Sequence, residues 1–378
     1  MKTKVFVSLL AVLVASFTSC TKLDTYHLRQ EYVKTAEAEA VSPTSVTLKG
    51  FAQGNLDEYT HSGGRGPVGL YVFYISESED MSNKKACIVD RQSPVPIYFG
   101  TPAGEKWDYY TDGHLNYRLM DNYDYYNKMY PAAYADVNVW TCLDGLESET
   151  TYYYYLSSRA ANGNEIVGEV KSFKTKMLIN GHSYVDLGLP SGTLWATCNV
   201  GAVKPEDSGF YLAWGETAPK SIYDWTSYNY CNGSSSTLKK YCCNSQYGNG
   251  GFVDNLETLE ASDDAATANW GTSWRMPTLE NFNELESSCS AIWMKRNGVD
   301  GYLFVGQNYG AIFLPATGSR VNDTIYYGLP TGEYWTSSLV KSQSNEAYYY
   351  REDSIKCRYS FSGRCNGLTV RPVSQSIN

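Results

Sequence analysis

The stretch Trp274-Arg275-Met276-Pro277-Thr278 decides the fold, because it predicts the start of a helix within a chain of short strands. Pro277 has a fixed φ and no N–H, so it suits the first turn of a helix, and Thr278 or a neighbour can cap the free amides. Phe282 and Leu285 follow three residues apart and predict an inward face. We therefore expect a helix from about residue 278 that packs into the core of its domain.

Short apolar runs surround this stretch, and loops containing Gly and Asp separate them. Such runs predict strands that share one hydrophobic core with the helix. Trp274 and Trp335 suit that core, because large aromatic rings bury much apolar surface. The runs are residues 311–316, 333–338 and 370–373.

The composition limits the classes of function. The chain has 378 residues, enough for two or three domains, and a net charge of −9. This acidity argues against nucleic acid as a partner, because no basic stripe replaces the counterions of a phosphate backbone. The 34 Tyr and 9 Trp outnumber the 12 Phe, and Tyr and Trp combine an apolar ring with a polar group that suits surfaces.

Residues 1–20 have the pattern of a targeting segment. Lys2 and Lys4 precede an apolar run at 5–17 that is short for a membrane span, and Thr18-Ser19-Cys20 follows it. The segment resembles a bacterial lipoprotein signal peptide, which implies that Cys20 becomes the lipidated first residue. An ordinary secretory signal is the alternative. We expect a soluble body that is lipid-anchored in the cell envelope, at the outer membrane and exposed at the surface.

Residues 21–38 are polar and Glu-rich and predict a flexible spacer. Residues 39–176 then have the alternation of an all-β domain. Leu146 lies six residues before Tyr152, and Thr150 lies two before it, which matches the corner in which a Tyr hydroxyl bonds back to the preceding turn of a β-sandwich. This half resembles a fibronectin type III domain, chiefly at its two ends.

A Tyr-rich insert between about residues 87 and 130 exceeds what such a domain needs. Aromatic faces stack on sugar rings and carboxylates bond sugar hydroxyls, so the insert suits a glycan site. An ordered loop that uses Tyr for packing is the alternative. The candidate ligand-binding residues are Trp107, Tyr109, Tyr110, Tyr123, Tyr125 and Tyr126.

Ordered motifs fill residues 177–378, from 184–202 through 213–217 and 269–278 to 364–373. Their order resembles the family named for the Fibrobacter succinogenes major paralogous domain. The resemblance implies a C-type-lectin-like fold on a Bacteroidetes-type surface lipoprotein, and it brings no catalytic residues. We thus expect a mainly β chain with a smaller α+β part, in which a fibronectin type III-like β-sandwich precedes a C-type-lectin-like α+β domain.

Within these motifs, Arg275 and Arg371 stand among apolar residues. A guanidinium in such a place must find a carboxylate or several carbonyls, so we expect both to pin loops. In a lectin-like fold the long loops carry recognition, which makes residues 211–247 a second candidate surface site. Its aromatic candidates are Tyr223, Trp225 and Tyr228.

Asp263-Asp264 is the best candidate for a metal site. With Glu216, Glu257 or Glu260 the pair offers oxygen ligands for calcium, which lectin-like folds often bind. The pair also precedes Ala265 as an N-cap and a first-turn acid would, and this capping role is favoured. We expect no cofactor, with calcium as the alternative.

The cysteines allow disulfides in an exported chain. Cys357 and Cys365 are eight residues apart and could bridge a hairpin, whereas Cys198 and Cys289 are expected to be buried free thiols. Zinc is disfavoured because no C-x-x-C pair occurs. Nucleophilic chemistry is disfavoured too, because His182 has no acidic neighbour in sequence.

The predicted function is non-catalytic recognition of a glycan or a protein at the cell surface, as in an adhesin. The alternative is a structural or assembly component of a surface appendage or complex. An enzyme distantly related to formylglycine-generating enzymes is the third hypothesis.

Overall fold

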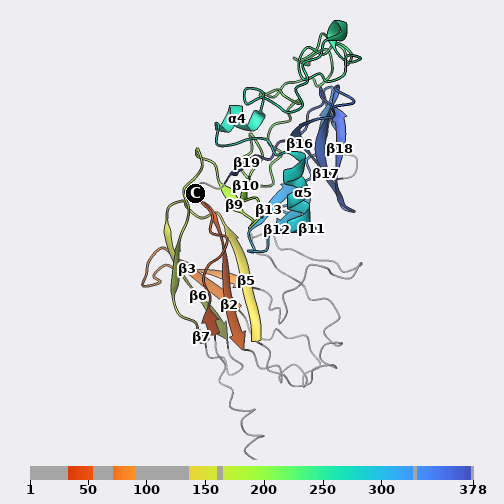
Figure 1. The fold of residues 1–378 in the computed structure, drawn as a ribbon. Helices are drawn as coiled ribbons and strands as arrows, with labels where there is room; N and C mark the ends of the chain where they lie inside the picture. Colours follow the sequence, from red (N-terminus) through yellow and green to blue (C-terminus); the bar gives the residue numbers. More distant parts are fainter. Residues whose placement is uncertain (1–32, 54–70, 90–135, 160–164, 327–329, 376–378) are drawn as a thin grey trace, which may run out of the picture.

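The computed structural model describes residues 33–53, 71–89, 136–159, 165–326 and 330–375. Within these ranges the protein is mainly β, with two α-helices and one short 3-10 helix. Strands β1 to β8 form one unit, and the later elements form a second unit beside it (Figure 1). No helix in these ranges is both long and apolar enough to cross a membrane.

The N-terminal unit is a sandwich of two antiparallel sheets. One sheet has the order β1-β2-β5, and the other has the order β4-β3-β6-β7, with β8 paired to the opposite end of β6. Leu48 of β2 and Leu156 of β6 are fully buried and meet in the core between the sheets. The strands are Val33–Thr35 (β1), Ser45–Gln53 (β2), Tyr71–Ser76 (β3), Lys85–Val89 (β4), Asp136–Asp144 (β5), Thr151–Arg159 (β6), Glu165–Val167 (β7) and Lys171–Lys174 (β8).

The predicted tyrosine corner lies at the start of β6. The Glu147 N–H donates a hydrogen bond of 3.0 Å to the Tyr152 hydroxyl, so the turn before the strand is tied to the strand itself. The Tyr152 ring is buried and stacks on Phe173 of β8. This part of the sequence prediction is confirmed.

The C-terminal unit contains four small antiparallel sheets and two α-helices. Their orders are β19-β10-β9, β11-β12-β13, β14-β15 and β16-β17-β18. The strands are Tyr184–Asp186 (β9), Thr193–Ala196 (β10), Ser290–Arg296 (β11), Val299–Val305 (β12), Ala311–Pro315 (β13), Ser319–Val321 (β14), Thr324–Tyr326 (β15), Thr331–Leu339 (β16), Glu346–Asp353 (β17), Cys357–Gly363 (β18) and Val373–Gln375 (β19). The helices are η1 (Asn249–Gly251), α4 (Ala265–Trp270) and α5 (Leu279–Ser288).

Helix α5 begins where the sequence predicts it. Thr278 is the N-cap, and its hydroxyl accepts from the Asn281 N–H while the Asn281 side chain accepts from the Thr278 N–H. Phe282 and Leu285 are fully buried, as expected. Pro277 precedes the cap and lies two residues before Leu279, the first residue of the helix, so its predicted place in the first turn is wrong. Since Pro277 lies outside the helix, it fixes the entry of the chain instead of the first turn.

The predicted core tryptophans Trp274 and Trp335 share one hydrophobic cluster with Trp214. Trp214, Trp274 and Trp335 are fully buried in it. Each indole N–H donates to a backbone carbonyl of a distant segment. Trp214 donates to Thr336 at 2.8 Å, Trp274 to Ile179 at 3.0 Å and Trp335 to Leu212 at 2.7 Å. The tryptophans therefore join segments as well as fill volume.

The two predicted structural arginines bond to oxygens, Arg371 to those of distant segments and Arg275 to those of residues close to it in sequence. Arg371 is fully buried and donates to the Asn199 side chain and to the carbonyls of Ala196, Thr197 and Phe313 at 2.8–3.2 Å. Arg275 donates to the side-chain oxygen of Asn281 at 2.8 Å and to the carbonyl of Met276 at 3.1 Å. The prediction is confirmed for Arg371, which joins distant segments, whereas the Arg275 side chain, within the described part of the chain, bonds only around the start of α5.

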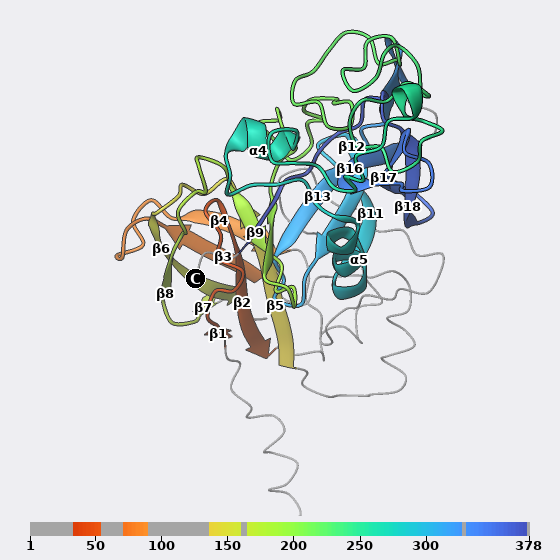
Figure 2. The same ribbon diagram turned by 45° about the horizontal axis from the view of Figure 1, so that its top comes forward.

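Strand β12 explains how the two units fit together. Its run from Tyr302 to Val305 is buried on both faces, which is unusual for an antiparallel strand. Tyr302 and Phe304 face the cluster beneath α5, whereas Leu303 and Val305 pack with Trp140 and Cys142 of β5. In both views β5 lies beside β13 (Figures 1 and 2). The sandwich thus covers the second face of the β11-β12-β13 sheet.

Tyr309 supplies much of the contact between the units. Its ring lies 5.2 Å from the Trp140 ring, the Lys49 ammonium lies 4.5 Å from its centre, and its carbonyl accepts from the Thr47 hydroxyl at 2.9 Å. We expect Tyr309→Ala to lower the free energy of unfolding by about 1 to 2 kcal/mol and to separate the unfolding of the two units. Differential scanning calorimetry measures both effects. Tyr326→Ala removes an exposed ring and should change neither, and a single unshifted transition for Tyr309→Ala would contradict this account.

Candidate functional site

The candidate site is the second surface segment predicted from the sequence, residues 211–247, here called the aromatic segment. It belongs to a longer stretch between β10 and α4 that contains no strand and only the 3-10 helix η1. The part of this stretch around η1 lies at the end of the molecule far from the sandwich in both views (Figures 1 and 2). Loops at such a place carry function more often than packed strands do, provided that they hold one shape.

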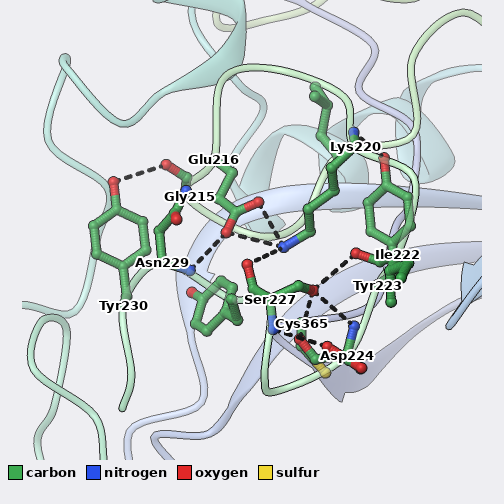
Figure 3. Close-up of polar contacts among 12 residues, drawn as sticks. Gly215, Glu216, Lys220, Ile222, Tyr223, Asp224, Ser227, Asn229, Tyr230 and Cys365 are labelled. Atoms are coloured by element: carbon green, nitrogen blue, oxygen red, sulfur yellow. Dashed lines mark hydrogen bonds and ion pairs between the residues drawn. The ribbon is translucent and has the colours of Figure 1, made fainter. Parts of the chain in front are cut away.

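A buried ion pair holds the first half of the aromatic segment (Figure 3). The Lys220 ammonium lies 2.8 Å from one carboxylate oxygen of Glu216 and 3.1 Å from the other. The same carboxylate accepts from the Asn229 N–H at 2.8 Å, and the ammonium donates to the Ser227 carbonyl at 3.1 Å. Since the Glu216 side chain is almost completely buried, removing either partner leaves an uncompensated charge. The pair therefore closes the loop between residues 216 and 229.

The tyrosines of this loop point their hydroxyls inward. Tyr228 donates to the Trp214 carbonyl at 2.7 Å, Tyr230 donates to the Gly215 carbonyl at 3.0 Å, and Tyr223 donates to the Tyr211 carbonyl. Burial raises the pKa of Tyr223 and, far more, that of Tyr228. These hydroxyls stay protonated and serve as fixed donors.

Two of the three aromatic candidates in this segment are therefore corrected. Tyr223 and Tyr228 are 1% and 3% exposed, so their rings belong to the core and offer no face to a ligand. Trp225 keeps part of its surface in solvent and packs edge-on against Tyr228 at 5.6 Å. The sequence could not separate these roles, because all three residues lie in one polar and aromatic run.

A tight turn sets the position of Trp225. The Asp224 carboxylate accepts from the Ser227 N–H and from the Thr226 hydroxyl, both at 2.8 Å, and the Ser227 hydroxyl donates to the Ile222 carbonyl at 2.8 Å (Figure 3). The bond from Thr226, followed by that from Ser227, lowers the pKa of Asp224. The turn thus presents Trp225 from a closed backbone.

Arg364 joins the aromatic segment to the rest of the unit, and the sequence analysis did not select it. It is fully buried and donates to the Tyr228 hydroxyl and to the carbonyls of Tyr241, Ser344 and Lys240 at 2.9–3.1 Å. Its guanidinium also lies 4.9 Å from the Trp214 ring. The signal was available, because Arg364 stands among small and apolar residues as Arg371 does.

The acidic pair Asp263-Asp264 divides into two separate roles. Asp264 caps α4 by accepting from the Thr267 N–H at 2.9 Å, and its other oxygen accepts from the Met276 N–H at 2.8 Å. Burial raises the pKa of Asp264. Asp263 accepts from the Lys240 ammonium and the Tyr241 hydroxyl, both at 2.6 Å. The N-cap prediction is confirmed for Asp264, whereas the predicted first-turn acid is wrong, because Asp263 precedes the cap and no acid lies in the first turn of α4.

The calcium alternative finds no support in this geometry. The Asp263 carboxylate already neutralises Lys240, and Asp264 is bonded to backbone amides. Among the residues that the structure describes, no group of three or more His, Cys, Asp or Glu side chains could hold a metal ion.

Eight of the described cysteines are free thiols: Cys142, Cys198, Cys231, Cys242, Cys243, Cys289, Cys357 and Cys365. The expected bridge between Cys357 and Cys365 is wrong, because the two residues pack into different clusters. Burial raises the pKa of each to about 12, and a protonated thiol is a weak nucleophile. Cys289, at the α5 cluster, and Cys198 are free thiols as predicted, but both are only partly buried.

His182 packs among tryptophans. Its ring stacks on Trp270 with the centres 3.8 Å apart and meets Trp274 edge-on at 6.5 Å. Burial lowers the pKa of His182, so the neutral ring is favoured. This environment suits packing between the start of the unit and α4.

Several candidates lie outside the described residues. They are the lipidation site Cys20 and the insert residues Trp107, Tyr109, Tyr110, Tyr123, Tyr125 and Tyr126. Their roles stay predictions from the sequence.

Comparison with known proteins gives little. No family model matches the chain, and no curated protein matches it. Two solved structures are similar, the short and long forms of the sensor domain of the anti-sigma factor RsgI4 of Pseudobacteroides cellulosolvens. Each is 11% identical with a TM-score of 0.21, and the matches cover 40% and 39% of this chain and 99% and 92% of those chains. A likeness this weak carries no argument about fold or function.

Proposed function

We propose that this chain is a non-catalytic recognition module of a lipid-anchored surface protein, and that it binds a glycan or a protein. The proposed binding surfaces are the outer side of the aromatic segment around Trp225 and the Tyr-rich insert. We also propose that the N-terminal sandwich is fibronectin type III-like and that the second unit is a C-type-lectin-like major paralogous domain.

One observation carries the functional proposal. The aromatic segment has almost no regular structure, yet it packs around the buried Glu216, which pairs with Lys220, and around the buried Arg364, which donates to backbone carbonyls. A loop held in this way loses little conformational entropy when it binds, which favours affinity. The partly exposed Trp225 then offers a rigid aromatic surface of the kind that stacks on sugars or anchors a protein contact.

The architectural proposal has separate support. The sheet orders β1-β2-β5 and β4-β3-β6-β7 and the Tyr152 corner are features of sandwiches of the immunoglobulin and fibronectin type. In the second unit, the motif residues Trp214, Trp274 and Trp335 converge in one core. The pattern of residues 1–20 supports the lipid anchor and the location at the cell surface.

A glycan array probed with the purified full chain tests the proposal. We expect binding to a subset of glycans, and we expect Trp225→Ala, or Tyr125→Ala combined with Tyr126→Ala, to weaken it at least about tenfold by removing aromatic contact. Tyr326→Ala is the matched control, because its ring is exposed on β15. Chelation of calcium should leave binding unchanged, since Lys240 already occupies Asp263.

The binding results test the two proposed binding surfaces and the recognition function separately. If binding survives both sets of changes, neither surface is the recognition site. If the chain binds nothing on the array or on immobilised surface proteins, the recognition function itself is wrong.

A further inference from the structure

The outer edge of the β16-β17-β18 sheet is open. Strand β18 stands at the end of the strand order, and all seven of its residues pair with β17 in unbroken register from Glu346↔Gly363 to Glu352↔Cys357. Backbone groups of residues 357–362 make no further bond to the part of the chain that the structure describes. Figures 1 and 2 both show β18 as the outermost strand of this sheet. A flat edge without proline or a bulge is a template for another strand.

The open edge also carries exposed aromatic rings. Tyr359 and Phe361 are 57% and 49% exposed, and they share one face because side chains alternate along a strand. On the same face Tyr350, opposite Tyr359, is buried under α5, where it stacks on Phe282 at 4.4 Å. The helix therefore covers one part of the face and leaves Tyr359 and Phe361 uncovered.

We propose that β18 pairs antiparallel with β18 of a second copy of this chain, about a two-fold axis at Ser360. The sequence Arg358-Tyr359-Ser360-Phe361-Ser362 is self-complementary in that register. Tyr359 of each copy lies opposite Phe361 of the other, and aromatic pairs directly across strands are stabilising. Arg358 lies opposite Ser362, so no like charges meet. One contact then pairs the open backbone edge of β18 and covers its two exposed rings.

The choice of a second copy follows from this symmetry. An isologous interface needs a surface patch that complements itself, and a strand with similar residues on either side of its central position meets that need. The pairing joins two three-stranded sheets into one sheet that continues across the axis. It goes beyond recognition of a ligand, and it is the kind of contact that an assembly component would use.

Variants that place opposite charges at the two facing aromatic positions test the proposed strand pairing. Self-association of the purified full chain is measured by sedimentation equilibrium, and we expect dimers. Tyr359→Lys and Phe361→Glu should each lower the association constant at least about tenfold, because each change removes both symmetry-related aromatic pairs. A mixture of the two variants should regain association, since the introduced lysine of one copy then faces the introduced glutamate of the other, while the native aromatic pair remains at the second position.

Tyr326→Lys is the control, because it places the same charge on another exposed aromatic residue outside β18, and it should leave association unchanged. Three outcomes would overturn the proposal. These are a monomeric wild-type chain at its highest soluble concentration, undiminished association of both single variants, and a mixture that associates no better than its components. Both changed residues are exposed, and circular dichroism of each variant should match that of the wild type.

Discussion

Replacement of Arg371 by alanine is expected to remove about 4 kcal/mol or more of the free energy of unfolding, a large part of the total for a domain. Its guanidinium makes four hydrogen bonds to fixed oxygens of residues 196, 197, 199 and 313. Without the guanidinium, these buried oxygens lose their hydrogen-bond donors, and β10 and β13 lose the side chain that links them. Urea unfolding followed by tryptophan fluorescence measures the effect, because the buried tryptophans lie in the same unit.

Two further variants sharpen the Arg371 test. Arg371→Lys keeps the charge but lacks the planar fork, so a single ammonium cannot reach all four acceptors, and we expect about half of the loss. Arg358→Ala is the matched control, because Arg358 is partly exposed and pairs with Asp353 at the surface, where such pairs contribute about 1 kcal/mol or less. An Arg371→Ala protein as stable as the Arg358→Ala protein would show that the buried guanidinium is dispensable.

The features that the sequence predicted correctly depend on short stretches. The cap at Thr278, the inward face of α5, the corner at Tyr152 and the cap at Asp264 each follow from residues within about six positions of one another. Local backbone chemistry decides such features, so a pattern of residue types is sufficient. The sequence also predicts that Arg371 bonds to buried oxygens, because a guanidinium among apolar residues must find acceptors wherever the chain supplies them.

The features that the sequence missed depend on distant segments. Tyr223 and Tyr228 are buried because residues 320–322 and Arg364 pack against them, and nothing within their own loop reveals this. The free state of Cys357 and Cys365 follows from their packing into two different clusters. The second buried face of β12 is covered by a sandwich strand that lies far earlier in the sequence. Tertiary contacts decide these features.

The second large effect concerns Glu352, whose side chain is fully buried in the C-terminal unit. Neither carboxylate oxygen has a hydrogen-bond partner of good geometry among the described residues, and the backbone of Gly332 lies so close that a methyl group there would stand 2.4 Å from one oxygen. Burial raises the pKa of Glu352 well above its ordinary value of 4.5, and the charge of Arg371 and the nearby Tyr302 amide offset this only in part. The folded protein therefore holds a neutral carboxylic acid.

This burial makes stability depend on pH. Above about pH 4.5 the unfolded chain releases the Glu352 proton while the folded chain keeps it, so the free energy of unfolding falls as pH rises, by up to about 1.4 kcal/mol per pH unit. Glu352→Gln cannot titrate, so its stability relative to wild type should rise with the same slope from pH 4.5 upward. Urea unfolding of both proteins at several pH values measures that difference. Any constant offset from the buried amide leaves the slope unchanged. A flat difference for Glu352→Gln would mean that the folded protein carries an ionised carboxylate at this position.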